Sequence, residues 1–427
     1  MTMTVATKLA ALMTPLLGAD LPVRIRAWDG SEAGPLDAPV LHITTRKALR
    51  RLLWEPNELG IAQAYITGEV DVPGGATELA DGLRQVWRHA RATNAGPISL
   101  STRQKLTAAR LALRLGALGR RPTVPSTQAK LTGGLHTRAR DRAAIAHHYD
   151  LSNEFYGLIL DESMAYSSGY YEKWDNTLIQ AQQAKLDLIC RKLDLQPGMR
   201  LLDVGCGWGS LSLHAAEHYG ARVLGVTISR QQHEFISKRI AERNLSDRVE
   251  VRVQDYREVR EQPFDAVSSI EMGEHVGEHN YPTYAGVLFS HLKPGGRLLL
   301  QQMSRHTGAA PGGGAFIENY IAPDMHMRPL SETLGFLERA GFEIRDVQAL
   351  REHYVRTVED WLATFEAHYA DAVAMVGEEM ARVWRLYLVG GGLSFEEGRM
   401  GVDQFLAVKP GELGESGMPP TPVWTQP

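Results

Sequence analysis

The 427-residue sequence predicts an α/β protein built around a doubly wound, mainly parallel sheet. Residues 200–229 have the order of a short apolar strand, a glycine turn, an amphipathic helix and a second strand. Further strand-like runs follow, and helix-length segments separate them. Because parallel strands need such crossover connections, this alternation indicates parallel rather than antiparallel pairing.

The glycine turn indicates a nucleoside-containing ligand. Residues 201–204 read as a buried strand, and Gly205, Gly207 and Gly209 follow it at the carboxyl edge of the predicted sheet. The spacing is G-x-G-x-G rather than the G-x-G-x-x-G of dinucleotide sites, and no P-loop lysine accompanies it. Such a turn suits a ligand with an amino-acid tail and a nucleoside, which points to S-adenosylmethionine (AdoMet). Taken alone, the turn fits any doubly wound domain.

The later strands strengthen this interpretation. They are expected at residues 221–227, 248–256, 264–272 and 297–303. The third strand of the sheet ends near Asp255, an acceptor placed to meet an adenine amino group. Residues 292–296 (LKPGG) form a turn that leads into the fifth strand. Together these features favour an AdoMet-dependent methyltransferase core over other doubly wound domains.

The cysteine content and the lengths of the apolar runs indicate the cellular compartment. The two cysteines, Cys190 and Cys206, form neither a disulfide framework nor a zinc-ligand pattern, which fits the reducing cytoplasm. No apolar run approaches the length of a membrane span. The apolar run that starts at Lys8 is short, broken by Pro15 and preceded by a single positive charge, so a signal peptide is disfavoured.

Two domains and a tail are predicted. The first hundred residues mix strand-like runs with a helical stretch at 47–54. Pro122, Pro125 and the Gly133–Gly134 pair indicate a linker. The expected organisation is a lipid-binding N-terminal domain at 1–120, a linker at 121–139, a methyltransferase domain at 140–410 and a disordered Pro/Gly-rich tail at 411–427.

Positive charge is concentrated near the N-terminus. Residues 1–140 hold 19 Lys and Arg against 10 Asp and Glu, and no acidic residue occurs between Asp81 and Asp141. Leucines alternate with basic residues in this span, at Lys105, Arg110, Arg114, Arg120 and Arg121. A basic amphipathic helix suits an anionic lipid surface, and the alternative is a solvated helix packed on its own domain. Nucleic acid is disfavoured, because the segment lacks aromatic stacking residues.

Several blocks of the chain are similar to the cyclopropane-fatty-acid synthase family of AdoMet-dependent lipid methyltransferases. The blocks cover nearly the whole chain and occur in family order: HHYDLSNEFYGLIL (147–160), MAYSSGYY (164–171), QAQQAKLDLICRKLDLQPGMRLLDVGCGWGSL (180–211), GVTISRQQ (225–232), QDYREV (254–259), EMGEHVGEHNYPTY (271–284) and FIENYIAP (316–323). The N-terminal region, with LGIAQAYITGEVDV at 59–72, resembles the lipid-binding domain of the phospholipid-acting members. The resemblance implies a seven-stranded AdoMet methyltransferase sheet with a smaller N-terminal α/β domain.

The resemblance also implies a chemistry. A cis alkene in a lipid acyl chain attacks the sulfonium methyl, and the protein must supply proximity and a dry tunnel because an alkene is a poor nucleophile. The resulting carbocation closes a cyclopropane if the new methyl loses a proton. It gives an exocyclic methylene if a hydride shift first moves the charge to the methyl-bearing carbon and the methyl group then loses a proton.

Cofactor contacts follow from the matching blocks. Tyr166 and Ser167 are expected over the methionine moiety, and Asp203 through Gly209 form the turn. Thr227 and Gln232 are expected near the ribose, and Tyr256 near the adenine beside Asp255.

The base site departs from the family pattern. Cyclopropane-forming relatives hold a bicarbonate ion, and their glutamate matches Glu274, the predicted catalytic carboxylate. The companion positions are Ser168 for a cysteine, Gln301 for a histidine, Met303 for a branched apolar residue and Leu362 for a tyrosine. These changes put bound bicarbonate in doubt. Glu274, buried beside an apolar tunnel, is expected to take the proton itself, with Glu271 as its nearest rival.

The sequence thus predicts formation of a methylene-branched acyl chain from an oleoyl-type phospholipid. A cyclopropane synthase with a rebuilt base site is the main alternative, and a non-catalytic lipid-binding scaffold or a small-molecule methyltransferase is more remote. The resemblance implies a peripheral location on the inner face of the cell membrane and a separate flavin-dependent reductase as partner, and it leaves a homodimer open.

Overall fold

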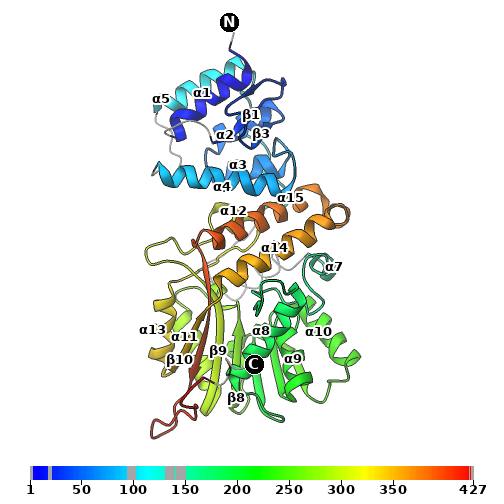
Figure 1. Cartoon of the computed structure of the whole chain (residues 1–427), viewed down its shortest axis with the longest axis vertical. Coiled ribbons are helices and arrows are strands. Elements are labelled where there is room, and N and C mark those ends of the chain that lie inside the picture. Colours follow the sequence, from blue (N-terminus) through cyan, green and yellow to red (C-terminus); the bar gives the residue numbers. More distant parts are fainter. Residues whose placement is uncertain are drawn as a thin grey trace. The chain divides into compact units, whose positions relative to one another are not determined.

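The computed structural model describes residues 3–17, 22–93, 102–129, 140, 151–422 and 424. The chain divides into two compact units (Figure 1). The first unit comprises Met1–Ala129, Gly314–Tyr320 and Phe365–Leu393, and the second comprises Lys130–Gly313, Ile321–Thr364 and Ser394–Pro427.

The second unit contains a seven-stranded sheet in the order β10-β11-β9-β8-β5-β6-β7. Strand β11 runs antiparallel to both of its neighbours, and the other paired strands are parallel. The doubly wound, mainly parallel sheet predicted from the sequence is therefore confirmed. The strands are β5 (Arg200–Val204), β6 (Arg222–Thr227), β7 (Val249–Val253), β8 (Phe264–Ile270), β9 (Leu292–Ser304), β10 (Glu343–Ala349) and β11 (Gly401–Val408).

Helices cover both faces of this sheet, which explains why its central strands are apolar throughout. Leu201 packs in one buried cluster with side chains of α8, α9 and α10, whereas Leu202 packs in the other with side chains of α11 and α13. Figure 1 shows these two sets of helices on opposite sides of the strands. Their bounds are α8 (Leu178–Leu193), α9 (Ser210–Tyr219), α10 (Arg230–Glu242), α11 (Tyr281–Ser290) and α13 (Leu330–Ala340).

Shorter elements complete the second unit. Helix α7 (Asn153–Gly157) precedes α8, and two 3₁₀ turns, η1 (Tyr256–Glu258) and η2 (Gly273–His275), follow β7 and β8. The longer helix α14 (Arg351–Ala367) begins after β10, and all but its last turn belongs to the second unit.

The largest differences between the predicted and observed strand boundaries are at β7 and β9. β7 ends at Val253, because the Asp255 side chain accepts from the Arg257 backbone N–H and starts η1 instead. The predicted 292–296 turn lies inside β9, where the ladder passes from a Phe264–Leu292 pair directly to an Ala266–Arg297 pair. The residues between leave the pairing as a bulge.

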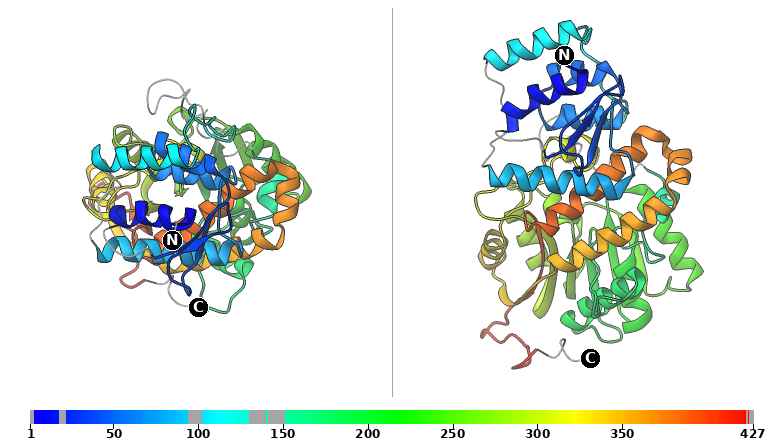
Figure 2. Two further views of the ribbon diagram at one scale, coloured as in Figure 1. Left: turned by 90° about the horizontal axis from the view of Figure 1, so that it is seen from above. Right: turned by 45° about the horizontal axis from the view of Figure 1, so that its top comes forward.

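The first unit is a small α/β fold whose four-stranded sheet has the order β2-β1-β3-β4. Helix α5 packs beside α1 and α2 (Figure 2). The elements are α1 (Val5–Leu17), β1 (Arg24–Arg26), β2 (Glu32–Ala33), β3 (Val40–Ile43), α2 (Arg46–Trp54), α3 (Glu58–Ile66), β4 (Val70–Asp71), α4 (Ala76–Ala92), α5 (Thr102–Arg114), α12 (Ala315–Tyr320) and most of α15 (Tyr369–Glu396).

The bounds of the first unit differ from the predicted domain. Segments 314–320 and 365–393, expected in the methyltransferase domain, belong to it. The Glu58 carboxylate accepts from the backbone N–H of Phe316, and Arg382 donates to the backbone oxygen of Tyr65. Contacts between such distant segments leave no local signal in the sequence. Residues 130–139 of the predicted linker lie outside the described residues.

Part of the predicted disordered tail is packed. Trp424 is buried in a cluster with Leu188 and Leu406, and Met418 lies against the same cluster. The expectation of disorder is therefore wrong for this part of the tail, because its apolar side chains have a partner surface on α8 and β11. Across the described residues, none of the helices combines the length and apolarity needed to cross a bilayer.

Candidate cofactor and carboxylate site

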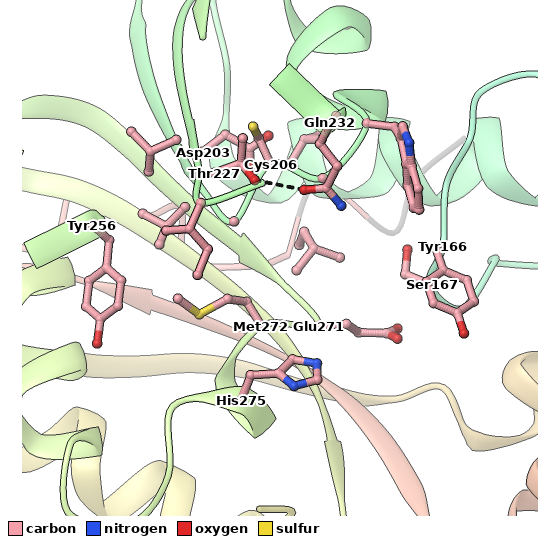
Figure 3. A pocket seen from close by; sticks show the side chains of 18 of the residues that line it. Tyr166, Ser167, Asp203, Cys206, Thr227, Gln232, Tyr256, Glu271, Met272 and His275 are labelled. Carbon is pink, nitrogen blue, oxygen red and sulfur yellow. Dashed lines mark hydrogen bonds between the residues drawn. The ribbon is translucent and has the colours of Figure 1, made fainter. Parts of the chain in front are cut away.

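A cavity lies in the second unit, at the carboxyl ends of β5, β6, β7 and β8 (Figure 3). Of the ten residues predicted to bind the cofactor, Gly209 is outside its lining. The other nine line it: Tyr166, Ser167, Asp203, Gly205, Gly207, Thr227, Gln232, Asp255 and Tyr256. The structure thus brings together residues from four separate sequence blocks, and their roles in binding stay predictions.

The three glycines of the turn serve different purposes. All have positive φ, at 76° for Gly205, 56° for Gly207 and 84° for Gly209, a region that favours glycine. A Cβ on Gly209 would lie 1.8 Å from Ile236 Cδ1, so this glycine permits α9 to approach α10. A Cβ on Gly207 would meet no described atom within 4 Å, so here the backbone is open to the cavity.

Polar side chains fix the edge of the cavity. The Asp203 carboxylate accepts from the hydroxyls of Ser212 and Ser268 at 2.7 and 2.9 Å. Burial raises the pKa of Asp203, and these hydrogen bonds oppose the rise. The Thr227 hydroxyl donates to Gln232 Oε1 at 2.8 Å, which fixes the Gln232 amide at the cavity (Figure 3).

Asp255, the predicted adenine acceptor, is held by Arg257. The guanidinium donates to both carboxylate oxygens, at 2.8 Å from Nε and 2.6 Å from Nη2. Both residues line the cavity, and Tyr256 lies between them in the chain. Each oxygen of the Asp255 carboxylate has a further lone pair, so Asp255 can also accept a hydrogen bond from an adenine amino group. This contact with adenine stays a prediction.

Tyr166 and Trp208 line the cavity and belong to a cluster of aromatic rings. The Tyr166 ring lies 5.3 Å from Trp361 and 5.6 Å from Tyr156, whose ring is 4.6 Å from Trp208 (centroid distances). Trp208 follows Gly207 in the turn and donates from Nε1 to Asn153 at 2.8 Å. Electron-rich rings of this kind attract a cation and also accept apolar chains.

Two carboxylates follow β8, and they lie in different environments. Glu271 lines the cavity and has φ of 49°, a region that residues other than glycine rarely adopt. Its Oε1 accepts from the Ser168 backbone N–H at 2.9 Å and from Gln301 Nε2 at 2.8 Å. Its Oε2 accepts from the Tyr354 hydroxyl at 2.7 Å.

Glu274 is buried behind this cavity and is not part of its lining. Its Oε1 accepts from the Met303 backbone N–H at 3.3 Å, and Oε2 has no hydrogen-bond partner among the described residues. Burial first, and the nearby charge of Glu271 second, raise the pKa of Glu274 to about 8.

Comparison with known proteins places this arrangement in a family. Residues 136–405 match the mycolic acid cyclopropane synthetase family. The chain belongs to this family. Among its relatives, a probable fatty acid methyltransferase of Mycobacterium tuberculosis is 36% identical over 94% of this chain and 95% of that protein. A probable fatty acid methyltransferase of Pseudomonas putida is 34% identical over 98% of both.

Solved structures of cyclopropane synthases match more than half of this chain. The cyclopropane synthase MmaA2 of M. tuberculosis is 31% identical, with a TM-score of 0.60 over 64% of this chain and 99% of that one. The mycolic acid cyclopropane synthase CmaA1, complexed with SAH and CTAB, is 32% identical, with a TM-score of 0.59 over 62% of this chain and 97% of that one.

Of the four positions expected to hold an anion, Ser168 and Gln301 contact Glu271 and Met303 contacts Glu274. Ser168 contributes its backbone N–H, because its hydroxyl donates to the oxygen of Gly169. Gln301 donates to Glu271 and accepts from Gln404. Met303 contacts Glu274 through its backbone.

A tyrosine of α14 contacts Glu271, at a position that the sequence analysis did not name. Leu362, expected where the family has a tyrosine, is partly exposed and lies outside the cavity lining. Tyr354 of the same helix, α14, supplies the hydroxyl instead.

Lys185 was missed by the sequence analysis. It is fully buried at the cavity and donates from Nζ to the Ser167 hydroxyl at 2.9 Å. Burial lowers the pKa of Lys185 to about 8, although Glu271, Asp161 and Asp203 act in the opposite direction. The sequence feature that could have identified Lys185 is the position of a charged lysine on the apolar side of α8.

Proposed function

We propose that this protein transfers the methyl group of AdoMet to the cis double bond of an unsaturated, oleoyl-type phospholipid acyl chain. Deprotonation then gives a methylene-branched acyl chain. The coarser activity, AdoMet-dependent methylation of fatty acyl chains, rests on the family membership. The observation that carries the finer proposal is the cavity in which a glycine turn, aromatic rings and one fixed carboxylate meet.

The residues at the cavity fit AdoMet. Gly207 leaves room for a ligand to approach the backbone. The Asp255–Arg257 pair and Gln232 offer hydrogen-bonding groups for a nucleoside, and the buried Lys185 amine offers a cation for an amino-acid carboxylate. AdoMet, when bound, supplies an electrophilic methyl group on a sulfonium.

The protein's own contribution is orientation, water exclusion and charge. An alkene reacts with the sulfonium methyl only if the two are held in contact, so the cavity must position the chain. Tyr166 and Trp208 can stabilise positive charge on their ring faces without acting as nucleophiles. The carboxylate of Glu271 adds a negative charge on the same cavity.

Ring closure is the alternative outcome, and one observation favours it. The hydrogen-bond network of Glu271, Gln301 and Tyr354 is a complete anionic site even though the family's histidine is absent. By contrast, the replacement of that histidine by Gln301 supports the methylene product. It changes the groups around the base, and the base determines how the carbocation loses its proton. Both products need the same methyl transfer.

A lipid surface is the proposed partner of the first unit. Helix α5 buries Ala108 and Ala112, while Leu106 and Leu113 are 51% and 66% exposed. Arg110 and Arg114 are exposed on the same helix. A solvated helix packed on its own domain would bury its leucines, so this outward mixture of leucine and arginine favours an anionic membrane. The side chain of Lys105 lies outside the described residues.

A peripheral location on the inner face of the cell membrane follows from this proposal. The separate flavin-dependent reductase and the homodimer stay predictions from the family resemblance.

Gas chromatography–mass spectrometry of acyl chains tests the product. The protein is expressed in a host that is rich in oleoyl phospholipid and lacks its own cyclopropane synthase. We expect an exocyclic methylene in the acyl chains. A cyclopropane would overturn the proposed product while retaining the methyl transfer. No modified chain, together with no AdoMet binding by calorimetry, would favour a lipid-binding scaffold.

A further inference from the structure

We propose that Glu271, rather than Glu274 or a diffusible anion, accepts the proton that the methylated acyl chain loses. This inference rests on the proposed methyl transfer to an alkene. It assigns the proton-transfer step to a side chain that the family resemblance did not mark as catalytic.

The first argument is geometric. The Glu271 carboxylate points into the cavity toward Tyr166 and Ser167, as Figure 3 shows. Three donors hold it, and they come from three separate places: the segment before α8, strand β9 and helix α14. A carboxylate fixed at both oxygens cannot rotate away, so its remaining lone pairs keep a constant direction.

The second argument is the backbone. Glu271 has φ of 49° at the end of β8, and glycine is the residue that takes such a conformation without strain. A glutamate in this position is tolerated at a cost, and strained residues of this kind concentrate at functional sites. The conformation is what turns the side chain into the cavity.

The third argument is the distribution of charge between the two buried carboxylates. Like charges in a shared low-dielectric site do not both ionise easily. Glu274 Oε2 has no hydrogen-bond partner among the described residues, whereas Glu271 has three donors. Burial raises the pKa of both carboxylates, to about 8 for Glu274, but the three hydrogen bonds and the nearby Lys185 oppose this rise at Glu271. The placement of the donors therefore favours the negative charge on Glu271.

The proton-transfer step balances as follows. Methyl transfer forms a C–C bond from the alkene electrons, breaks the S–CH₃ bond and leaves a carbocation on the chain. A 1,2-hydride shift moves the positive charge onto the carbon that bears the new methyl group. A C–H bond of that methyl group then breaks, its electron pair forms the exocyclic C=CH₂ bond, and the proton passes to a Glu271 oxygen. Carbocations have very acidic neighbouring protons, so a hydrogen-bonded carboxylate is basic enough. The proton leaves to solvent after product release.

Glu271→Gly tests the assignment, because glycine suits the positive φ and the variant should keep its fold. Methyl transfer is measured on oleoyl phospholipid vesicles in buffer freed of carbon dioxide. We expect turnover to fall by about 100-fold or more, with AdoMet affinity by calorimetry within about three-fold of wild type. Formate or bicarbonate at tens of millimolar should increase the turnover of this variant by at least about ten-fold, because the three donors can hold a small carboxylate.

Controls separate the outcomes. Glu278→Gln removes one exposed carboxylate downstream in the same loop and should show neither loss nor rescue. Glu271→Gln, which keeps the side-chain volume, should lose turnover without rescue because the site stays filled. Full turnover of Glu271→Gly without added anion, or a loss that no anion restores, would overturn the assignment. A wild-type enzyme that makes no methylated product would instead refute the proposed function.

Discussion

The hydroxyl of Tyr354 donates a 2.7 Å hydrogen bond to Oε2 of Glu271, although the two residues lie 83 positions apart in the sequence. This contact joins α14 to the end of β8 and completes the set of donors around the cavity carboxylate. It also places a titratable hydroxyl against the residue proposed to accept the proton.

Tyr354→Phe should slow turnover while leaving AdoMet binding intact. A hydrogen bond to a charged group contributes about 1.5–3 kcal/mol, so its loss should lower kcat by roughly 10- to 100-fold if the bond positions the carboxylate. Steady-state kinetics and AdoMet calorimetry measure the two effects. Tyr219→Phe, which removes another tyrosine–carboxylate bond in the second unit, should leave kcat unchanged. Equal losses in both variants would contradict a specific role for Tyr354.

Glu274→Gln should change how stability depends on pH. Folded Glu274 has a pKa of about 8, raised from 4.5, so between these values the folded chain keeps a proton that the unfolded chain has lost. The free energy of unfolding of the wild type therefore falls as pH rises through this window, by up to about 1.4 kcal/mol per pH unit from this group. Glutamine carries no such proton.

Urea unfolding of both proteins between about pH 5 and pH 8 measures this difference. The stability of the variant relative to wild type should increase steadily with pH, and Glu278→Gln should show no such trend. A constant difference across the range would mean that Glu274 is ionised in the folded protein.

Gly209→Ala should mainly reduce stability, whereas Gly207→Ala should mainly reduce AdoMet affinity. The Gly209 variant forces a methyl into Ile236 at a positive φ, which should cost roughly 2–5 kcal/mol of unfolding free energy. The Gly207 variant meets no described atom, so its cost should be only about 1–2 kcal/mol of backbone strain. Its methyl intrudes on the cavity, so AdoMet affinity should fall by about ten-fold or more. Thermal unfolding and calorimetry together distinguish the pair.

Charge reversal on the first unit should weaken membrane binding. Replacing Arg110, Arg114, Arg120 and Arg121 by glutamate removes four cations, each contributing about 1 kcal/mol at an anionic surface. Sedimentation with phosphatidylglycerol vesicles should then show a loss of roughly 1000-fold in affinity, and wild-type binding should itself weaken with salt. Lys238→Glu, an exposed cation of the second unit, serves as the control. Undiminished vesicle binding by the quadruple variant would leave α5 as a solvated helix.

Local features of the sequence determined the sheet and the cofactor edge. The apolar run before Gly205 predicts a strand buried on both faces, and Leu201 and Leu202 indeed pack in opposite clusters. The glycine turn and the residues that follow successive strands converge because the carboxyl ends of parallel strands share one edge. These properties depend on neighbours in the chain, so they could be inferred from the sequence.

The tertiary structure decided the rest. Nothing local in EMGEH indicates which glutamate faces the cavity, because that depends on the positive φ of Glu271 and on donors supplied by distant β9 and α14. The same holds for Lys185, whose burial beside Ser167 follows from the packing of α8, and for the segments 314–320 and 365–393 that join the first unit. Side-chain direction and long-range contact are set by the packed fold, and sequence periodicity carries neither.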